Sequence, residues 1–343
     1  QVANELPDVI YMKPDHILEL KSSLLPWKKD EELVKQNKYV DILANNKDGD
    51  GSYYGLPMKV FSEWVYYRKS IFKELNLQIP KTWDDFIKTA ETIKASGKYI
   101  PIAMGGKDCW PCYPFNEFMP LVVGNNANLL TDIARQDKPF GIGSAFYKAY
   151  SMVDRLYKAD VMGKPLDTSW SESEQLMASK KSAMLLAGQY FLGDYKNFGG
   201  DMNDIAVFPL PMTNNRNEPK KTIVVVDLFL GISKNSQNVD LAKKYIEWFF
   251  NTDIYKPYIC DRYMTSTIKG VDSENMFTKA MKDQKIETFM YVPGDENYTK
   301  LVSETRWDTK TIGTMMLAGK DYRSILSEYN EKWKAAGIKL GIK

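Results

Sequence analysis

The sequence lacks most of the residues from which catalytic and metal sites are built. It has a single histidine, His16, so a Ser-His-Asp or Cys-His arrangement, or a histidine-rich metal site, would depend on that one residue. No stretch has the GxxxxGK[ST] spacing of a phosphate-binding loop, because 105-GGKD-108 lacks both the earlier glycine and the hydroxyl residue. We therefore predict no catalytic residues, no metal ligands and no cofactor.

Two further absences limit the partners of the chain. No apolar run approaches the roughly 20 residues that a helix needs to span a bilayer. The 46 basic and 44 acidic residues are well mixed and give a net charge of +2, so we expect no nucleic-acid partner. Three cysteines in 343 residues are also too few for a disulfide framework.

Aromatic residues are abundant instead. The chain has 8 Trp, 21 Tyr and 15 Phe, which make up 13% of its residues. Trp and Tyr pack in cores, but they also form flat, half-exposed surfaces on which ring-shaped ligands stack. The hydrophobic fraction of 44% is sufficient for real cores, and the length indicates two lobes of ~150 residues each.

Helical and strand patterns alternate along the chain. The clearest helix is predicted over 80–97, where Thr82 is the N-cap, Asp85 occupies the capping-box position and Gly97 ends the helix. This alternation predicts an α/β fold with a mainly parallel sheet in each lobe. Strands are expected at 7–12, 53–67, 99–104, 182–188, 204–211 and 222–233, and further helices at 15–25, 69–76, 145–160, 172–180, 240–251 and 299–336.

The stretch 107-KDCWPCYPF-115 has the Cys-x-x-Cys spacing of a thiol–disulfide enzyme, with Cys109 and Cys112. Such an enzyme needs its motif at the start of a helix that follows a strand, where the helix dipole lowers the thiol pKa. Pro111, Pro114 and the nearby glycines favour a loop instead. A Cys-x-x-Cys oxidoreductase stays open as an alternative, as does a glycosidase, whose two carboxylates need not be close in sequence.

Seven separated stretches cover nearly the whole chain and resemble, in order, a known family. The family is that of the extracellular sugar-binding proteins of ABC importers, solute-binding protein family 1 of the maltodextrin-binding protein type. The most specific stretches are 54-YGLPMKVFSEWVYYRKSIFKEL-75 and 80-PKTWDDFIKTAETIKASGKYIPIAM-104. The others are 7-PDVIYMKPDHILELKSSLLPW-27, 175-QLMASKKSAMLLAGQYF-191, 204-DIAVFPLP-211, 229-FLGISKNSQNVDLAKKYIEWFFNTD-253 and 312-IGTMMLAGKDYRSILSEYNEKW-333.

The resemblance implies a class II periplasmic-binding-protein fold, in which two α/β lobes with mainly parallel sheets are joined by hinge crossings and close on the ligand. The crossings are expected near Lys59–Phe61, Val226–Leu228 and Phe289–Val292. Lobe 1 would then comprise residues 1–60 and 228–289, and lobe 2 residues 61–227 and 290–343. Family members normally begin with a further strand, helix and strand, and we expect this opening of lobe 1 to be missing here.

The same resemblance implies a function. We expect a non-enzymatic extracellular protein, either a cell-surface lipoprotein or periplasmic, that captures an oligosaccharide in a cleft between the lobes. It would deliver this ligand to the transmembrane permease of an ABC importer and act as a monomer. The same fold binding a peptide, polyamine or anion is a further alternative, which the near-neutral charge makes less attractive.

Sugar recognition needs flat aromatic faces for the C–H side of a pyranose and planar polar groups for its hydroxyls. Tyr190 resembles a position where the family often has a stacking aromatic, and Trp307 resembles the family's aromatic on the last segment facing the cleft. For both residues the alternative is core packing. Arg306 could bind two hydroxyls at once. Trp110 lies in the loop after the strand at 99–104, where family members often have an aromatic against the sugar.

Five more residues are candidate ligand contacts by the same resemblance or by their place near a crossing. Glu63 and Trp64 lie at the first crossing, and Trp170 precedes a helix near the same mouth. Asp15 matches a family position that contacts sugar hydroxyls, which competes with its own role as a helix N-cap. Asp227 interrupts an apolar strand, where a charge is costly unless paired, so it is either a hinge partner or a hydroxyl acceptor.

The two cysteines of the Cys-x-x-Cys stretch flank Trp110. In an oxidising exterior Cys109 and Cys112 could bridge, which would add about 2 kcal/mol in the chain-entropy model and stiffen the aromatic residue between them. Cys260 is then left unpaired. The motif is therefore interpreted as a possible staple around a stacking platform.

Overall fold

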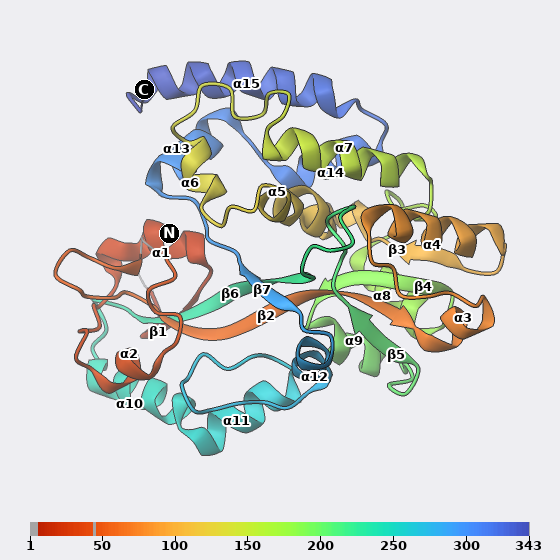
Figure 1. Ribbon diagram of the computed structural model, residues 1–343. Helices are drawn as coiled ribbons and strands as arrows, with labels where there is room; N and C mark the ends of the chain where they lie inside the picture. Colours follow the sequence, from red (N-terminus) through yellow and green to blue (C-terminus); the bar gives the residue numbers. More distant parts are fainter. Residues whose placement is uncertain (1–5, 44–45, 343) are drawn as a thin grey trace. The chain divides into compact units, whose positions relative to one another are not determined.

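The computed structural model describes residues 6–43 and 46–342, without the side chains of Asp15 and Leu18. By its internal contacts the chain divides into two compact units, drawn in Figure 1. Unit 1 consists of Gln1–Ser62 and Val224–Asn275, and unit 2 of Glu63–Ile223 and Met276–Lys343. Two of the expected lobe boundaries lie close to these changes of unit, whereas the third, at 289/290, lies inside unit 2. The assignment of lobes stays a prediction.

Unit 1 has a small antiparallel sheet. Its strands are β1 (Val9–Met12), the second part of β6 (Lys221–Ile232) and the first part of β2 (Leu56–Arg68). The register pairs β1 with β6 from Val9 opposite Ile232, and β2 with β6 from Leu56 opposite Leu230 to Ser62 opposite Val224. Helices of this unit are α1 (Pro14–Leu20), α2 (Glu32–Gln36), α10 (Val239–Phe250) and α11 (Thr252–Asp261), together with the short turn η1 (Lys21–Ser23).

Helix α1 begins two residues earlier than it would with an N-cap at Asp15. Pro14 occupies the first helical turn and Lys13 is the N-cap residue, with extended backbone angles. Proline suits this position because the N–H that it lacks would have no partner within the helix. The prediction that Asp15 caps the helix is therefore wrong, and its side chain lies outside what the structure describes.

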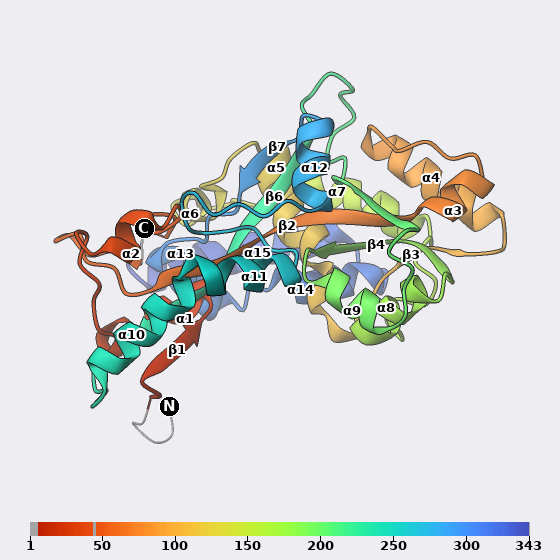
Figure 2. The same cartoon turned by 90° about the horizontal axis from the view of Figure 1, so that it is seen from below.

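The sheet of unit 2 is built around the second part of β2. This strand pairs with β4 (Ser182–Gly188) over Glu63–Tyr67 and with β5 (Ile205–Phe208) over the overlapping residues Val65–Arg68, and β4 pairs with β3 (Ile100–Ala103). All seven residues of β4 are buried. Helix α4 (Trp83–Ala95) lies on one side of β3 and β4, whereas α8 (Trp170–Ala178) and α9 (Phe191–Asn197) lie on the other (Figure 2). A short strand, β7 (Glu287–Met290), pairs with β6.

The expectation of mainly parallel sheets is wrong for the described residues. Of the five strand pairs with a described register, only β3–β4 is parallel and the other four are antiparallel. The connectivity explains the difference for the two longest strands. Because β2 carries the chain from unit 1 into unit 2 and β6 carries it back, the two run in opposite directions.

Helices supply the other core of unit 2. They are α5 (Met119–Val123), α6 (Leu129–Ile133), α7 (Ala145–Lys158), α13 (Glu296–Thr305), α14 (Thr309–Leu317) and α15 (Tyr322–Lys339), whereas α12 (Met276–Asp283) packs on β5 and α3 (Lys69–Glu74) directly follows β2. The long helix α15 packs along α7 and α13 (Figure 1). Phe140, Phe146 and Trp333 are buried here with at most 1% of their surface exposed.

Local sequence signals fix where several helices start. Thr82 and Asp85 form the predicted capping box of α4, and Gly97 ends the helix region with a left-handed φ of 67°. Ser169 and Glu172 form a second capping box at the start of α8. Within the described part of the chain, no helix combines the length and the apolar character that crossing a membrane requires.

Candidate functional site

Four aromatic side chains of unit 2 form what we call the aromatic cluster: Trp110, Tyr113, Trp170 and Tyr190. The rings of Trp110 and Tyr113 are nearly parallel, with an interplanar angle of 16° and centroids 6.0 Å apart. The ring of Trp170 is 4.7 Å from that of Trp110, and Tyr190 lies 6.4 Å from Trp110 and 6.2 Å from Trp170. Tyr113 is buried, whereas the other three are partly exposed.

The parallel pair of strands explains why residues so far apart in sequence meet. Trp110 follows β3 through the short turns η3 (Gly106–Asp108) and η4 (Trp110–Cys112), and Tyr190 follows β4 directly. Since β3 and β4 are parallel neighbours, their carboxyl ends lie at the same edge of the sheet. Ligand sites of α/β sheets are commonly found at this edge. Trp170, at the first position of α8, completes the cluster.

The buried carboxyl group of Glu63 is hydrogen-bonded to the aromatic cluster. The hydroxyl of Tyr113 donates to Oε2 of Glu63 at 2.7 Å and lies 2.8 Å from the hydroxyl of Tyr190. Glu63 is 4% exposed, and among the described residues its Oε1 has no hydrogen-bond partner. Burial raises the pKa of Glu63 well above its usual range, and the hydrogen bond from Tyr113 offsets this only in part.

The backbone around Trp170 is held by close packing on the η3 segment. Its N–H donates to Oδ2 of Asp108 at 2.6 Å. A Cβ atom added to Gly105 would lie 2.6 Å from Cα of Trp170 and 2.7 Å from its nitrogen, which is closer than real Cβ contacts come. A glycine is therefore needed at residue 105 for Trp170 to reach the cluster.

Substituting Gly105 by alanine is expected to displace Trp170 and to destabilise the protein by about 1–3 kcal/mol, the usual cost of overpacking a well-packed site. Tryptophan fluorescence should change at the same time, because Trp170 moves relative to Trp110. Gly193→Ala in α9 is the matched control, since nothing lies within 4 Å of its added Cβ. Urea unfolding and emission spectra that are identical for the two variants would contradict the close packing.

A second buried carboxyl group, Glu174, lies one turn along α8 from Trp170. It is 3% exposed. Burial is the main cause that raises its pKa to about 8, and the neighbouring carboxyl of Asp194 on α9 contributes. The folded state therefore holds a proton that the unfolded chain, with a glutamate pKa near 4.5, has lost. Between these two values the folded protein binds more protons than the unfolded chain, so the free energy of unfolding falls as pH rises.

The substitution Glu174→Gln is expected to remove this fall in the free energy of unfolding at high pH. The glutamine keeps the size and stays uncharged, so the variant should be more stable than the parent protein above pH ~8, by on the order of 2 kcal/mol, and similar to it near pH ~5. The measurement is urea unfolding across this range, with Glu91→Gln on the exposed face of α4 as control. An unchanged pH slope in Glu174→Gln would show that another group causes it.

Three of the expected ligand contacts lie elsewhere in unit 2. Trp307 is 3% exposed and stacks on Phe140 with centroids 4.1 Å apart, so it is part of the helical core. Trp64 has no exposed surface and packs against Phe277. Arg306 is exposed at the end of α13 in a left-handed conformation. The structure does not bring these residues to the aromatic cluster, and for both tryptophans it favours core packing.

The remaining expected contacts belong to unit 1. Asp227 forms ion pairs with Lys13 and, at 3.2 Å, with Lys59, which supplies the pairing that a charge within an apolar strand requires. The side chain of Asp15 lies outside the described residues. Contacts of either residue with a ligand stay predictions.

The Cys-x-x-Cys stretch was expected to be a loop with a bridge between Cys109 and Cys112, and the structure differs on both points. Cys109 and Cys112 are free thiols, so the predicted staple is wrong; Sγ of Cys109 instead lies 3.7 Å from the Thr311 hydroxyl of α14. The expected loop is helical, since Pro111 and Pro114 sit in the first turns of η4 and η5 (Pro114–Phe118), where proline is tolerated.

The buried thiol of this stretch is unsuited to thiol–disulfide exchange. Burial, the largest cause, raises the pKa of the Cys112 thiol to about 12. Thiol–disulfide enzymes have the opposite shift, because the thiolate is the nucleophile.

Two residues that hold the cluster in place were not among the expected ligand contacts. Tyr113 joins Glu63 to Tyr190, and Asp108 holds the backbone of Trp170. The spacing of Trp110 and Tyr113 was a usable signal, because residues three apart lie on one side of a helical turn. No sequence signal connects Asp108 with a residue that lies 62 positions later.

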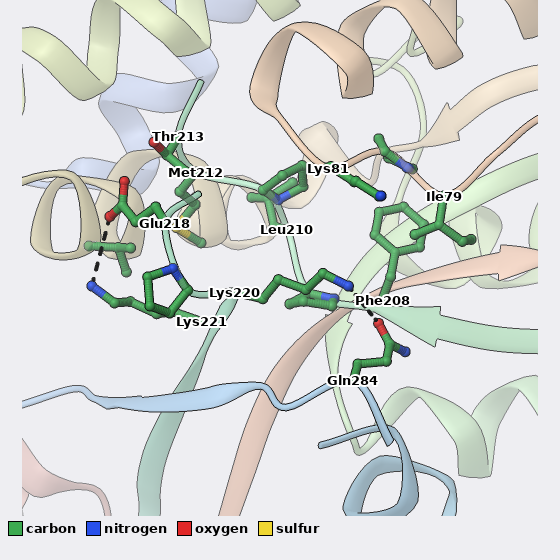
Figure 3. A pocket seen from close by; sticks show the side chains of 15 residues that line it. Ile79, Lys81, Phe208, Leu210, Met212, Thr213, Glu218, Lys220, Lys221 and Gln284 are labelled. Atoms are coloured by element: carbon green, nitrogen blue, oxygen red, sulfur yellow. Dashed lines mark hydrogen bonds and ion pairs between the residues drawn. The ribbon is translucent and has the colours of Figure 1, made fainter. Parts of the chain in front are cut away.

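A pocket of unit 2 lies apart from the cluster. It is lined by Ile79–Lys81, Val122, Phe208–Thr213, Glu218–Lys221 and Gln284, and Figure 3 shows the lysine and glutamine side chains around its apolar floor. Lys220 donates to Gln284 at 3.4 Å, and Lys221 pairs with Glu218 at 3.9 Å. Its volume of ≈ 30 Å³ is small, and none of the expected ligand contacts lines it.

Comparisons with known proteins show the family and the fold of the chain. A family model described as "Bacterial extracellular solute-binding protein" matches residues 2–256. The multiple sugar-binding protein of Streptococcus mutans is 24% identical over 288 residues, which are 79% of this chain and 64% of that protein. The chain thus spans slightly less than two thirds of the length of this relative.

Two solved structures are similar in fold. A binding protein of an ABC transporter from Bifidobacterium animalis subsp. lactis, in complex with mannobiose, has a TM-score of 0.82 at 18% identity, covering 98% of this chain and 82% of that one. The second is the binding protein RafE in complex with raffinose, which has a TM-score of 0.79 at 17% identity and covers 98% of this chain and 87% of that one. RafE is a protein of Streptococcus pneumoniae. At these identities the likeness shows the fold.

Proposed function

Because the chain belongs to the bacterial extracellular solute-binding protein family, we propose that it is the substrate-binding component of an ABC importer. It captures an oligosaccharide outside the cell and delivers it to the transmembrane permease. In this proposal the protein is not an enzyme, acts as a monomer and is a cell-surface lipoprotein or a periplasmic protein. A class II periplasmic-binding-protein fold with two lobes and hinge crossings is part of the same proposal.

The observation that carries the proposal is the convergence of Trp110, Trp170 and Tyr190. Their rings are partly exposed and lie within 6.4 Å of one another at the carboxyl edge of β3 and β4. Rings that converge at different angles offer apolar faces to the C–H sides of sugar rings. The Tyr190 hydroxyl brings a polar group to the same place, as sugar hydroxyls require.

The charges around the cluster support an uncharged solute. An anion would need a cation in the cluster, and its four residues, Trp110, Tyr113, Trp170 and Tyr190, have no cationic side chain. Of the carboxyl groups near the rings, the two buried ones, Glu63 and Glu174, are held in their uncharged form by burial, which disfavours a polyamine. Mannobiose and raffinose, the ligands named for the two similar structures, are uncharged.

Titration calorimetry tests the proposal. The panel contains mannobiose, mannotriose, raffinose, stachyose and a chitin oligosaccharide, with a peptide and spermidine as representatives of the other solute classes. We expect at least one oligosaccharide to bind with a Kd of about 1 μM or tighter, and chromatography of the mixture to recover it uncleaved. Binding of the peptide or spermidine alone would overturn the assignment of the solute, and cleavage of the sugar would favour a glycosidase.

A further inference from the structure

The side chain of Glu63 is buried against the aromatic cluster, and among the described residues it has no cationic partner. It is 4% exposed, and its only described side-chain hydrogen bond is the one from Tyr113 to Oε2, at 2.7 Å. Its Oε1 is buried without a partner among the described residues. A carboxylate anion is strongly disfavoured in such a place, whereas an uncharged carboxyl group is tolerated.

The hydroxyls of the cluster continue this contact as a chain from Glu63 through Tyr113 to Tyr190, with 2.8 Å between the two tyrosine oxygens. Each hydroxyl has one hydrogen to donate, and an ionised carboxylate only accepts. With Glu63 ionised, Tyr113 must donate to it, so the hydrogen bond between the tyrosines has to come from Tyr190. With Glu63 protonated, the carboxyl can donate to Tyr113, which is then able to donate to Tyr190.

We propose that Glu63 is a positioning residue for solute capture, which in its protonated, uncharged form fixes Tyr113 and, through it, the ring of Tyr190 in the aromatic cluster. This inference rests on the proposed function. Glu63 does not touch the solute in this proposal. It acts by holding the stacked pair of Trp110 and Tyr113, and the Tyr190 hydroxyl, in the arrangement that the sugar meets.

Within the part of the chain that the structure describes, the groups that face Glu63 carry no positive charge. Three tyrosines face Glu63. Tyr66 lies on the same strand, Tyr113 follows η4 and Tyr190 follows the end of β4. From β6, the hydroxyl of Thr222 donates to the backbone oxygen of Glu63 at 2.6 Å. These groups are all uncharged at neutral pH. Burial also raises the pKa of a second carboxyl near the cluster, Glu174 behind Trp170, so this group has to be removed from the measurement.

Infrared spectroscopy of the ligand-free protein tests the protonation state directly. A protonated carboxyl has a carbonyl band well separated from that of a carboxylate. In a Glu174→Gln background at neutral pH, we expect such a band, and we expect the further substitution Glu63→Gln to abolish it. A band that survives Glu63→Gln, or no band in the background protein, would overturn the proposal whether or not a sugar binds.

Binding measurements test the positioning role with the oligosaccharide that binds best in the calorimetric panel. Glu63→Gln, which is uncharged and can still bond to Tyr113, is expected to stay within about threefold of the parent Kd. Glu63→Leu and Tyr113→Phe should each weaken binding about tenfold, and the double variant should be no weaker than either, because both break one chain. Urea unfolding confirms that each variant is folded.

The possible failures are distinguishable. A Gln variant as weak as the Leu variant would show that the charged form acts, and Leu and Phe variants that bind like the parent protein would show that the chain plays no part in capture. If the parent protein binds none of the sugars, the proposed function fails instead, while the infrared result still decides the state of Glu63.

Discussion

The double substitution Trp110→Ala/Trp170→Ala is expected to weaken oligosaccharide binding by about a hundredfold or more. Buried or half-buried tryptophans at binding sites commonly contribute about 2 kcal/mol or more each, and a hundredfold change in Kd corresponds to about 2.7 kcal/mol. The two rings lie 4.7 Å apart, so their removal deletes most of the apolar surface of the aromatic cluster. Calorimetry with the best-binding sugar measures the effect.

Trp248→Ala is the matched control for this experiment. Trp248 lies on α10 of unit 1 and is 52% exposed, so its loss removes an equally large ring from an exposed helix face outside the cluster. Its Kd should stay within about twofold of the parent value, a change below 0.5 kcal/mol. If the double variant is folded and binds as tightly as the control, the aromatic cluster is not the sugar site.

Asp204→Ala is expected to destabilise unit 2 by about 3–5 kcal/mol, because it leaves the buried guanidinium of Arg68 without its counter-ion. The Arg68 side chain is only 4% exposed, and its Nη2 lies 2.9 Å from Oδ2 of Asp204. The same carboxylate accepts from the N–H of Ser70 at 2.6 Å and from its hydroxyl at 2.7 Å. Urea unfolding should report the loss as a lower midpoint with an unchanged slope.

The stability difference between the parent protein and Asp204→Ala is expected to depend on pH. Burial by itself would raise the pKa of Asp204, but the hydrogen bonds from Ser70 and the charge of Arg68 outweigh it and lower the pKa. The stabilisation is therefore present above the ordinary aspartate pKa and is lost as pH falls through the lowered value. The gap between parent protein and Asp204→Ala should narrow in acid.

Two further variants separate the ion pair from a general effect of losing a carboxylate. Glu331, on α15, forms an exposed ion pair with Lys138. Its substitution Glu331→Ala should lower the free energy of unfolding by less than about 1 kcal/mol. The double variant Arg68→Met/Asp204→Ala should recover part of the loss, since it removes the buried charge together with its partner. A double variant less stable than Asp204→Ala would contradict the explanation.

Much of the local structure could be predicted because its causes are local. The capping box of Thr82 and Asp85 involves residues three apart, and α4 starts where they predict. The same holds for the general position of strands such as β4 and β6, which are rich in apolar residues. The Cys-x-x-Cys stretch could not be predicted in this way. Its prolines suggest a loop, but each lies in the first turn of a short helix, where proline is tolerated.

The candidate site was predicted only in part, for a reason that lies in packing. Tyr190, Trp110 and Trp170 were expected as ligand contacts and do meet, whereas Trp64 and Trp307 are buried in the cores of unit 2. An aromatic residue on a core element and one at a strand end carry the same sequence signal. What separates them is how much surface their neighbours cover, which depends on elements far away in the chain.

The sequence by itself therefore determined the chemistry that this protein has available: one histidine, few cysteines, a balanced charge, many aromatic residues and the ordered stretches of its family. These properties are carried by single residues and short segments, so they are visible without a fold. Only the tertiary structure decided which aromatic rings converge and that a buried carboxyl lies beneath them. Residues 63, 113 and 190 become neighbours because β2 and β4 pair and β3 lies parallel to β4, and strand pairing over such distances leaves no local mark in the sequence.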